Sequence, residues 1–343
     1  MPPKKISPWR FVLLAMVLAG AFILNISLGS VHIPFADTLG MLFGGEASNE
    51  SWRYILFEYR LPKGVTAMLT GSGLALSGLL MQTLFRNPLA GPFVLGISSG
   101  ASLGVALLIM GASFFMGFES VQWINSLSLV LAAGTGSFMV LFLVMIMASK
   151  VRDTMALLII GLMLGSITSA VVAVLAHFSQ AESLQQYIFW SFGSLGDLRW
   201  GQVGFLSLLV LLGLGLSIVC IKPLNALLLG ERYAQSLGVS LKQSRFIIIL
   251  ATGLLAGGIT AFAGPIAFIG LAVPHLTRQL IPSSNHQIMV PTVMGYGAIL
   301  LLLCDTVAQW PGHEQVLPLN AVTSMVGAPV VIWLLVRKRK AVF

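Results

Sequence analysis

Long apolar runs separated by short polar segments dominate the pattern of the chain. A helix needs about 20 apolar residues to cross the hydrocarbon core of a bilayer. Ten runs approach that length and predict membrane spans at residues 9–29, 63–84, 94–116, 127–149, 155–177, 201–221, 244–262, 266–281, 287–309 and 319–336. The pattern therefore predicts an all-α polytopic membrane protein, with ten transmembrane helices in a single domain over residues 1–343.

The longest polar segments are residues 30–62 and 222–243. With ten spans both termini lie on the same side of the membrane. If that side is the cytoplasm, only four of the 19 basic residues fall outside, namely Arg53, Arg60, Lys63 and Arg199. Basic residues accumulate on the cytoplasmic side of membrane proteins, so this distribution predicts cytoplasmic termini. It also explains the net charge of +8 without a nucleic-acid partner.

Composition excludes a soluble protein. Hydrophobic residues make up 57% of the chain and charged residues 9%, with a mean hydropathy of +0.94. A soluble domain carries about 25% charged residues. The two cysteines, Cys220 and Cys304, lie in apolar runs, which favours small core residues over a disulfide or a metal pair.

The chemistry that the sequence offers is sparse. It lacks the G-x-x-x-x-G-K-[ST] phosphate loop, so we expect that this chain does not itself bind ATP in that manner. The five histidines are scattered, which argues against a membrane enzyme, a catalytic site or a metal site. Asp305 is the one acidic residue inside a predicted span. A transporter driven by an ion gradient would need more such groups, and it is kept as a remote alternative.

Glycines at four-residue spacing recur in the predicted spans. Such pairs let helix backbones approach closely, so we expect tight helix packing, with the lining of a pathway as the alternative. The pairs are Gly100/Gly104, Gly161/Gly165 and Gly253/Gly257.

The cytoplasmic segment 222–243 contains a candidate partner site. Its middle, Glu231–Leu237, predicts a short helix that ends at Gly238, a favoured helix-stop residue. Ala234 and Leu237 would form a small apolar face opposite polar side chains. A lipid-bound helix needs bulky apolar residues, so docking to a protein partner is favoured.

Four motifs together carry a family resemblance. They are "RLPKGVTAMLTGSGLALSGLLMQTLFRNPLAGPFVLGISSGASLG" (60–104), "LLLGERYAQSLGV" (227–239), "GPIAFIGLAVPHLTR" (264–278) and "VTSMVGAPVVIWLL" (322–335). This order and spacing resemble the iron-siderophore, haem and vitamin B12 permease family, the ten-helix membrane subunits of type II ABC importers. The resemblance implies a homodimer around a central pathway, two cytoplasmic ATPase subunits that bind ATP and Mg, and an external substrate-binding protein.

The resemblance also implies roles for individual residues. Asn87, Leu89, Thr154 and Met155 match the cytoplasmic gate. Arg60 and Lys63 match positions that receive acidic residues of the binding protein. Seven positions match the ATPase-coupling segment of the family, which lies within the cytoplasmic coupling loop 222–243. They are Glu231, Arg232, Ala234, Gln235, Ser236, Leu237 and Gly238.

The chain departs from the family pattern at three positions. Met155 replaces a small hydroxyl residue of the B12 member, and Gly91 stands where relatives often have an acidic residue. Gln309 occupies a third basic docking position, so that ion pair is absent, whereas Asp305 is retained as a structural hydrogen-bonding residue. We expect a permease without a cofactor of its own in the lipid of a bacterial cytoplasmic (inner) membrane. Iron-siderophore is the expected substrate because that class is the most populated, with haem or vitamin B12 as alternatives.

Overall fold

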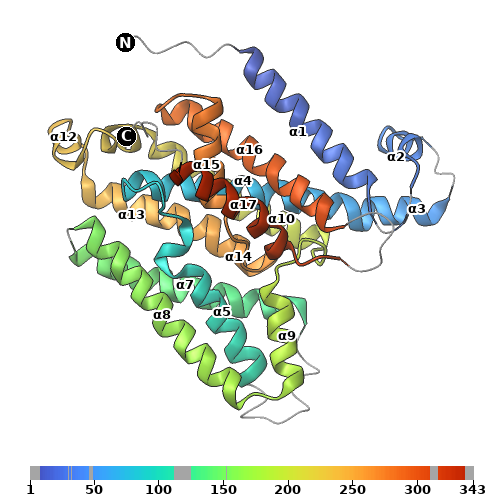
Figure 1. The fold of residues 1–343 in the computed structure, drawn as a ribbon, viewed down its shortest axis with the longest axis horizontal. Helices are drawn as coiled ribbons and strands as arrows, with labels where there is room; N and C mark the ends of the chain where they lie inside the picture. The colour runs from blue at the N-terminus through green and yellow to red at the C-terminus, as the bar shows by residue number, and fades with distance from the viewer. Residues whose placement is uncertain are drawn as a thin grey trace.

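The computed structural model describes residues 8–29, 31, 33–45, 49–111, 125–151, 153–309 and 316–336. All regular elements within these ranges are helical, and most run lengthwise through one bundle (Figure 1). Three of them, η1, η3 and η5, are π-helical turns continuous with α-helices. In chain order the elements are α1 (Trp9–Ser27), α2 (Phe35–Leu42), α3 (Glu50–Tyr54), η1 (Ile55–Arg60), α4 (Leu61–Leu84), η2 (Pro92–Leu95), α5 (Ile97–Ala106), η3 (Leu107–Gly111), α7 (Ser126–Lys150), α8 (Thr154–Phe178), α9 (Ala181–Ser191), α10 (Trp200–Val219), α11 (Ile221–Leu227), α12 (Glu231–Ser236), α13 (Leu241–Thr252), η5 (Gly253–Gly257), α14 (Gly258–Ala263), α15 (Ile269–Leu280), α16 (His286–Ala308) and α17 (Leu319–Val336).

Each of the ten predicted segments overlaps a helix in the described part of the chain. Seven helical stretches there are long and apolar enough to cross a membrane, and Ile97–Gly111 and Leu319–Trp333 are shorter apolar helices. The helix of segment 266–281 is α15, whose 12 residues reach about 18 Å at 1.5 Å per residue, short of the roughly 30 Å hydrocarbon core. Residues 112–116 of the predicted span 94–116 lie outside the described residues.

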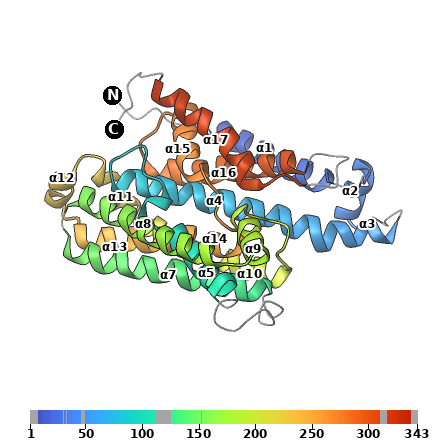
Figure 2. The same cartoon turned by 60° about the horizontal axis from the view of Figure 1, so that its bottom comes forward.

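The predicted polar segment 30–62 contains structure that the apolar pattern does not show. It holds α2, α3 and η1, and α3 and η1 continue into α4 as one helical stretch, Glu50–Leu84, of 35 residues. These elements lie at the end of the bundle opposite α12 (Figures 1 and 2). We call the two ends the α12 end and the α3 end.

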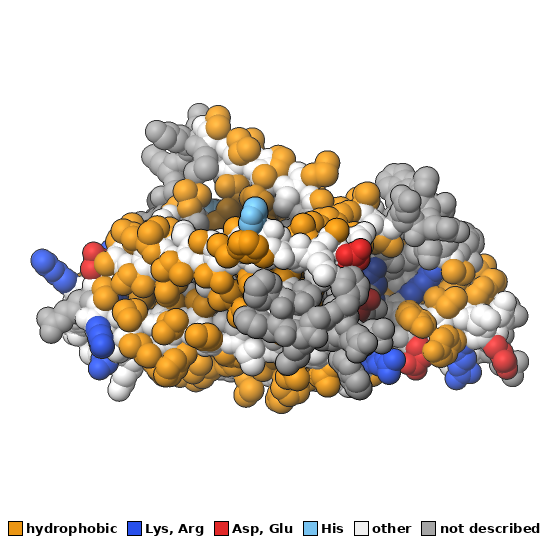
Figure 3. Space-filling view, turned by 90° about the horizontal axis from the view of Figure 1, so that it is seen from below, with side chains coloured by type: hydrophobic (Ala, Val, Ile, Leu, Met, Phe, Trp, Pro, Cys, Tyr) orange, Lys and Arg blue, Asp and Glu red, His pale blue; other side chains and the backbone are white. Residues whose placement is uncertain are grey.

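The core of the bundle is built around α4. The most apolar window of Glu50–Leu84 is 78% buried, and that of Leu241–Ala263 is 72% buried. The corresponding windows of α1, α7, α8 and α10 are 22–28% buried, so these helices form the periphery. Hydrophobic side chains cover the middle of the face in Figure 3, with most charged side chains toward the two ends, as expected for a lipid-facing surface.

Glycines bring the central helices into backbone contact. A Cβ atom on Gly71 of α4 would overlap the carbonyl of Gly297 in α16, and one on Gly78 would overlap the carbonyl of Gly270 in α15. Each predicted four-residue pair also has a glycine for which a Cβ would overlap a neighbouring helix or turn: Gly100 and Gly104 with α7, Gly161 with Val94, and Gly253 with Leu141. Close packing, the expectation for these pairs, is therefore confirmed.

Candidate gate and coupling site

The α12 end carries the short helix that the sequence predicts. The chain leaves α11, turns at Gly230 with φ of +109°, and forms the six-residue α12 from Glu231. Gly238, with φ of +80°, ends it, and the amide of Gly238 donates to the Gln235 carbonyl at 2.9 Å. Both glycines adopt backbone angles that side chains disfavour, which is the physical reason for their positions.

Most of α12 and the turn after it faces outward. Ala234 is fully buried beneath the helix, as its predicted apolar face requires. Leu237 is not part of that face, because the helix ends at Ser236 and the Leu237 side chain is 57% exposed. Tyr233, which the sequence reading missed, is 52% exposed. The remaining exposed residues of the predicted coupling segment are Arg232, Gln235, Ser236 and Gly238.

A hydrogen-bonded cluster joins the predicted coupling segment to the predicted gate. Glu231 Oε1 accepts from Thr154 Oγ1 at 2.6 Å and from Arg245 Nη2 at 2.7 Å, and the same Nη2 lies 2.9 Å from Thr154 Oγ1. Glu231 and Thr154 are the first residues of α12 and α8, and Arg245 lies in α13. We call these three residues the Thr154–Glu231–Arg245 cluster. Arg245 supplies the positive charge of the cluster, and it was not singled out from the sequence.

The electrostatics of the cluster favour an ionised Glu231. Partial burial acts to raise the pKa of Glu231, but hydrogen bonds from Thr154 and Arg245, together with the charge of Arg245, outweigh it. The pKa of Glu231 is therefore lowered from its usual value. Hydrogen bonds between ionised partners are the stronger kind, so the cluster holds the start of α12 in place at neutral pH.

The other predicted gate residues lie in a tight turn after α4. The amide of Leu89 donates to Asn87 Oδ1 at 2.9 Å, and His275 Nε2 donates to the Pro88 carbonyl at 2.7 Å. His275 thus uses its ring in a hydrogen bond within the chain. Arg86 starts the turn with φ of +47°, and its Nη1 lies 3.6 Å from the place that a Cβ on Gly230 would occupy. The turn therefore also reaches the coupling segment.

Exposure differs among the four predicted gate residues. Leu89 and Met155 are 44% and 50% exposed, whereas Thr154 and Asn87 are partly buried. Met155 follows Thr154 at the start of α8, where its amide donates to Asp153 Oδ1 at 2.9 Å. The structure thus brings all four residues to the α12 end.

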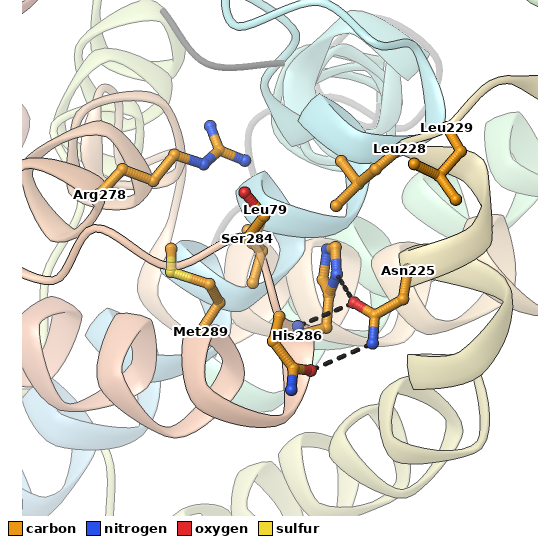
Figure 4. A pocket seen from close by; sticks show the side chains of 9 residues that line it. Leu79, Asn225, Leu228, Leu229, Arg278, Ser284, His286 and Met289 are labelled. Carbon is orange, nitrogen blue, oxygen red and sulfur yellow. Dashed lines mark hydrogen bonds between the residues drawn. The ribbon is translucent and has the colours of Figure 1, made fainter. Parts of the chain in front are cut away.

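A cavity of about 380 Å³ lies beside this region, between α4, α11, α15 and α16 (Figure 4). Asn225 and His286 point toward each other there, with Asn225 Oδ1 2.7 Å from His286 Nδ1. His286 Nε2 is 3.0 Å from Thr83 Oγ1, and Arg278 Nη1 donates to Gln82 at 2.9 Å. Nothing in the sequence pattern marks this polar network, because its members come from separate segments.

The predicted docking residues at the α3 end do not display free charges. Arg60 is only 8% exposed, and its guanidinium donates to the carbonyls of Ile26, Ser27 and Val31. Unpaired carbonyls at and just after the end of α1 hold the Arg60 guanidinium inside the chain in this structure, and its docking role stays a prediction. The Nζ atom of Lys63 lies 3.1 Å from Asp305 Oδ1, and the Lys63 side chain is 17% exposed.

Asp305 is a buried structural acceptor, as the sequence reading expects. Besides its ion pair with Lys63, its Oδ2 accepts from Asn25 Nδ2 at 2.9 Å and from Gln309 Nε2 at 2.6 Å. Gln309 thus uses its side chain within the chain. In the described part of the molecule no group of three or more His, Cys, Asp or Glu side chains could hold a metal ion.

A bundle of apolar helices, with a polar link between an exposed short helix and the end of a spanning helix, is typical of a multi-pass membrane transport subunit. The FecCD transport family matches residues 16–337, and the chain belongs to that family as the permease of an ABC importer.

Relatives along the whole chain agree with this assignment. The vitamin B12 import system permease protein BtuC of Klebsiella pneumoniae is 36% identical over 334 residues, covering 96% of this chain and 94% of the relative. The hemin transport system permease protein HmuU of Yersinia pestis is 34% identical over 316 residues, covering 92% and 93%. A solved inward-facing metal-chelate type ABC transporter superposes with a TM-score of 0.83 at 29% identity, covering 97% of this chain and 100% of that one.

Proposed function

We propose that the chain is the permease subunit of an ATP-driven importer for an iron-siderophore complex, acting as a homodimer in the bacterial cytoplasmic (inner) membrane. Two ATPase subunits bind ATP and Mg, an external binding protein delivers the substrate, and no chemistry takes place in this chain. The observation that carries the proposal is the Thr154–Glu231–Arg245 cluster, because it links an exposed segment suited to an ATPase with a residue at the proposed gate.

The proposed transport cycle assigns a different step to each end of the bundle. ATP binding in the partner subunits displaces α12, whose outward residues Tyr233 and Leu237 offer apolar contact to the ATPase. The spanning helices then reorient, and the substrate descends along the dimer axis and leaves past Leu89 and Met155. Aromatic and other apolar side chains form the core of protein interfaces, which suits Tyr233 and Leu237 to contact with the ATPase.

Haem and vitamin B12 are the competing substrates. The relatives named above are a vitamin B12 permease and a hemin permease, and either substrate would use the same pathway. All three are large metal chelates, which agrees with the superposition on a metal-chelate type transporter. The choice between them rests with the binding protein, so it has to be measured.

The test is uptake into vesicles by the reconstituted complex of permease, ATPase and binding protein. Internal ATP is supplied, and 55Fe-ferrichrome, 55Fe-haemin and 57Co-cyanocobalamin are offered separately. The proposal expects ATP-dependent uptake of the ferric siderophore, and ATP-dependent uptake of haem or cobalamin alone would replace it with the alternative. Uptake that needs no ATP but stops with an ionophore would instead support the remote alternative, a secondary transporter.

We expect the binding protein to dock at the α3 end, where exposed cations add to the predicted positions Arg60 and Lys63. Arg53 and Arg199 are exposed there. Both lie near Phe57. The Arg53 guanidinium is 6.0 Å from the Phe57 ring centroid. Trp200, which follows Arg199 in the sequence, donates to the Phe57 carbonyl at 3.0 Å. Exposed cations suit an acidic partner surface, since complementary charge steers encounter.

A further inference from the structure

The Thr154–Glu231–Arg245 cluster connects three elements that the chain could otherwise move separately. Its three atoms form a closed triangle of contacts, 2.6, 2.7 and 2.9 Å on a side, with Glu231 Oε1, Thr154 Oγ1 and Arg245 Nη2 at the corners. Each atom bonds to both others, so a displacement of one side chain changes both of its contacts. A triangle of this kind transmits position more strictly than a single hydrogen bond, because it restrains direction as well as distance.

Burial makes Arg245 the fixed corner of this triangle. The Arg245 side chain is 9% exposed, against 37% for the Glu231 side chain. It comes from α13, which continues through η5 and α14 as a largely buried stretch, Leu241–Ala263. An ion pair with one buried partner is less screened by water than a surface pair, and moving Glu231 away would take its carboxylate from a buried charge.

The α12 helix depends on such a link because it is short. Six residues are too few to form a stable helix without tertiary contacts. Glycines with positive φ, Gly230 and Gly238, flank it, so the chain turns sharply before and after it. Ala234, buried beneath it, supplies only a methyl group for packing. The first residue, Glu231, is therefore the main polar anchor of α12 to the spanning helices.

We propose that Arg245 is a positioning residue that ties α12 to the start of α8, so that displacement of α12 by the ATPase reaches the gate at Thr154. This inference rests on the proposed function, because it assumes a partner that moves α12. Arg86 brings the second gate turn close to the same segment, because its Nη1 lies 3.6 Å from the place that a Cβ on Gly230 would occupy. Both gate segments thus lie near the start of α12, and the link from Thr154 includes the ion pair of Glu231 with Arg245.

The test compares uptake with ATP hydrolysis in the reconstituted complex. The variants are Arg245→Leu, Arg245→Lys and Thr154→Val, and the matched control is Lys150→Ala, which removes an exposed cation from the end of α7, outside the coupling loop. The measured quantity is substrate taken up per ATP hydrolysed, with the substrate that the wild type transports among 55Fe-ferrichrome, 55Fe-haemin and 57Co-cyanocobalamin.

For Arg245→Leu we expect uptake per ATP to fall about tenfold while stimulation of the ATPase by the binding protein persists. Arg245→Lys keeps the charge beside Glu231 and recovers part of the ratio, whereas Lys150→Ala leaves it at the wild-type value. A purely structural role would instead lower uptake and hydrolysis together, in proportion to the amount of folded complex.

An unchanged ratio in Arg245→Leu overturns the proposal. If that variant does not assemble, Thr154→Val decides, because it removes one corner and leaves the Glu231–Arg245 pair in place. Its ratio should fall by severalfold, and an unchanged ratio again overturns the proposal. A wild-type complex that takes up none of the three substrates contradicts the proposed function, and this inference falls with it. Wild-type uptake with unaltered variants contradicts this inference alone.

Discussion

At the residue scale, removing the ion pair between Lys63 and Asp305 tests how much it stabilises the α3 end. Asp305→Asn removes the negative charge and leaves the Lys63 ammonium, 17% exposed, without its 3.1 Å partner. Breaking a buried pair on one side costs about 3 kcal/mol, the lower end of the usual range, since Lys63 keeps some contact with water. We expect the thermal unfolding midpoint of the detergent-purified permease to fall by several degrees.

The control for this prediction removes both charges. Lys63→Met combined with Asp305→Asn leaves no unpaired charge, so it should regain most of the lost stability. A single Asp305→Asn variant that melts like the wild type would show that Asn25 and Gln309 hold this region without the ion pair.

The lowered pKa of Glu231 predicts how the α12 end responds to acid. A carboxyl whose pKa is lower in the folded state stabilises the fold above its unfolded value, about 4.3, and loses that contribution as the pH falls through the folded value. The difference in melting midpoint between wild type and Glu231→Gln should therefore be constant from pH 6 to 8 and shrink below about pH 4. Melting curves across pH measure it, and a difference that grows on acidification would contradict the assignment.

Which of these side chains could be assigned from sequence depends on whether their partners are local. Gly238 acts through its own backbone, so the end of α12 could be predicted. Arg60 could not, because its guanidinium is held by carbonyls about 30 residues earlier that become available only where α1 ends. Arg245 was missed for the same reason, since its partner Glu231 belongs to another helix.

At the element scale, the contact between α4 and α15 depends on the missing side chains of Gly78 and Gly270. Gly78→Ala would place a Cβ on the carbonyl of Gly270, so the two helices would have to separate. Overpacking of this kind costs about 1–3 kcal/mol, and here backbone rather than a flexible side chain must move. We expect a lower melting midpoint and less folded protein by size-exclusion chromatography.

The matched control is Gly215→Ala in α10, where a Cβ would meet nothing within 4 Å. Alanine is the better helix former by about 1 kcal/mol, so this variant should be as stable as the wild type or more so. Equal behaviour of the two alanine variants would argue against close α4–α15 packing.

Helices that face lipid or the core could be predicted from apolar length alone. The elements that were missed, α2, α3 and α9, have 8, 5 and 11 residues and mixed composition. Their helical state comes from contacts and caps, such as Asn49, which accepts from the Ser51 amide at 2.9 Å at the start of α3. Such elements lack the periodicity that makes a long apolar run readable.

At the scale of the whole molecule, the two ends of the bundle divide the proposed work, and the α3 end makes the remaining prediction. Arg53→Glu and Arg199→Glu reverse exposed charges around Phe57, so association with the binding protein should slow about tenfold at low salt. The effect should vanish near 1 M salt, where the Debye length is about 3 Å. Surface plasmon resonance on nanodisc-embedded permease measures the association rate.

A charge reversal at the α12 end distinguishes docking at the α3 end from an effect of the overall charge on association. Lys242→Glu changes the total charge by the same amount at an exposed site in the first turn of α13, near α12. If docking uses the α3 end, this variant should associate at nearly the wild-type rate, because charges much farther away than the Debye length of about 10 Å at 0.1 M salt are screened. Equal slowing by all three reversals would mean that the overall charge governs encounter. If only Lys63→Ala slows association, Lys63 is the docking residue. Its ion pair with Asp305 would then have to open in the complex.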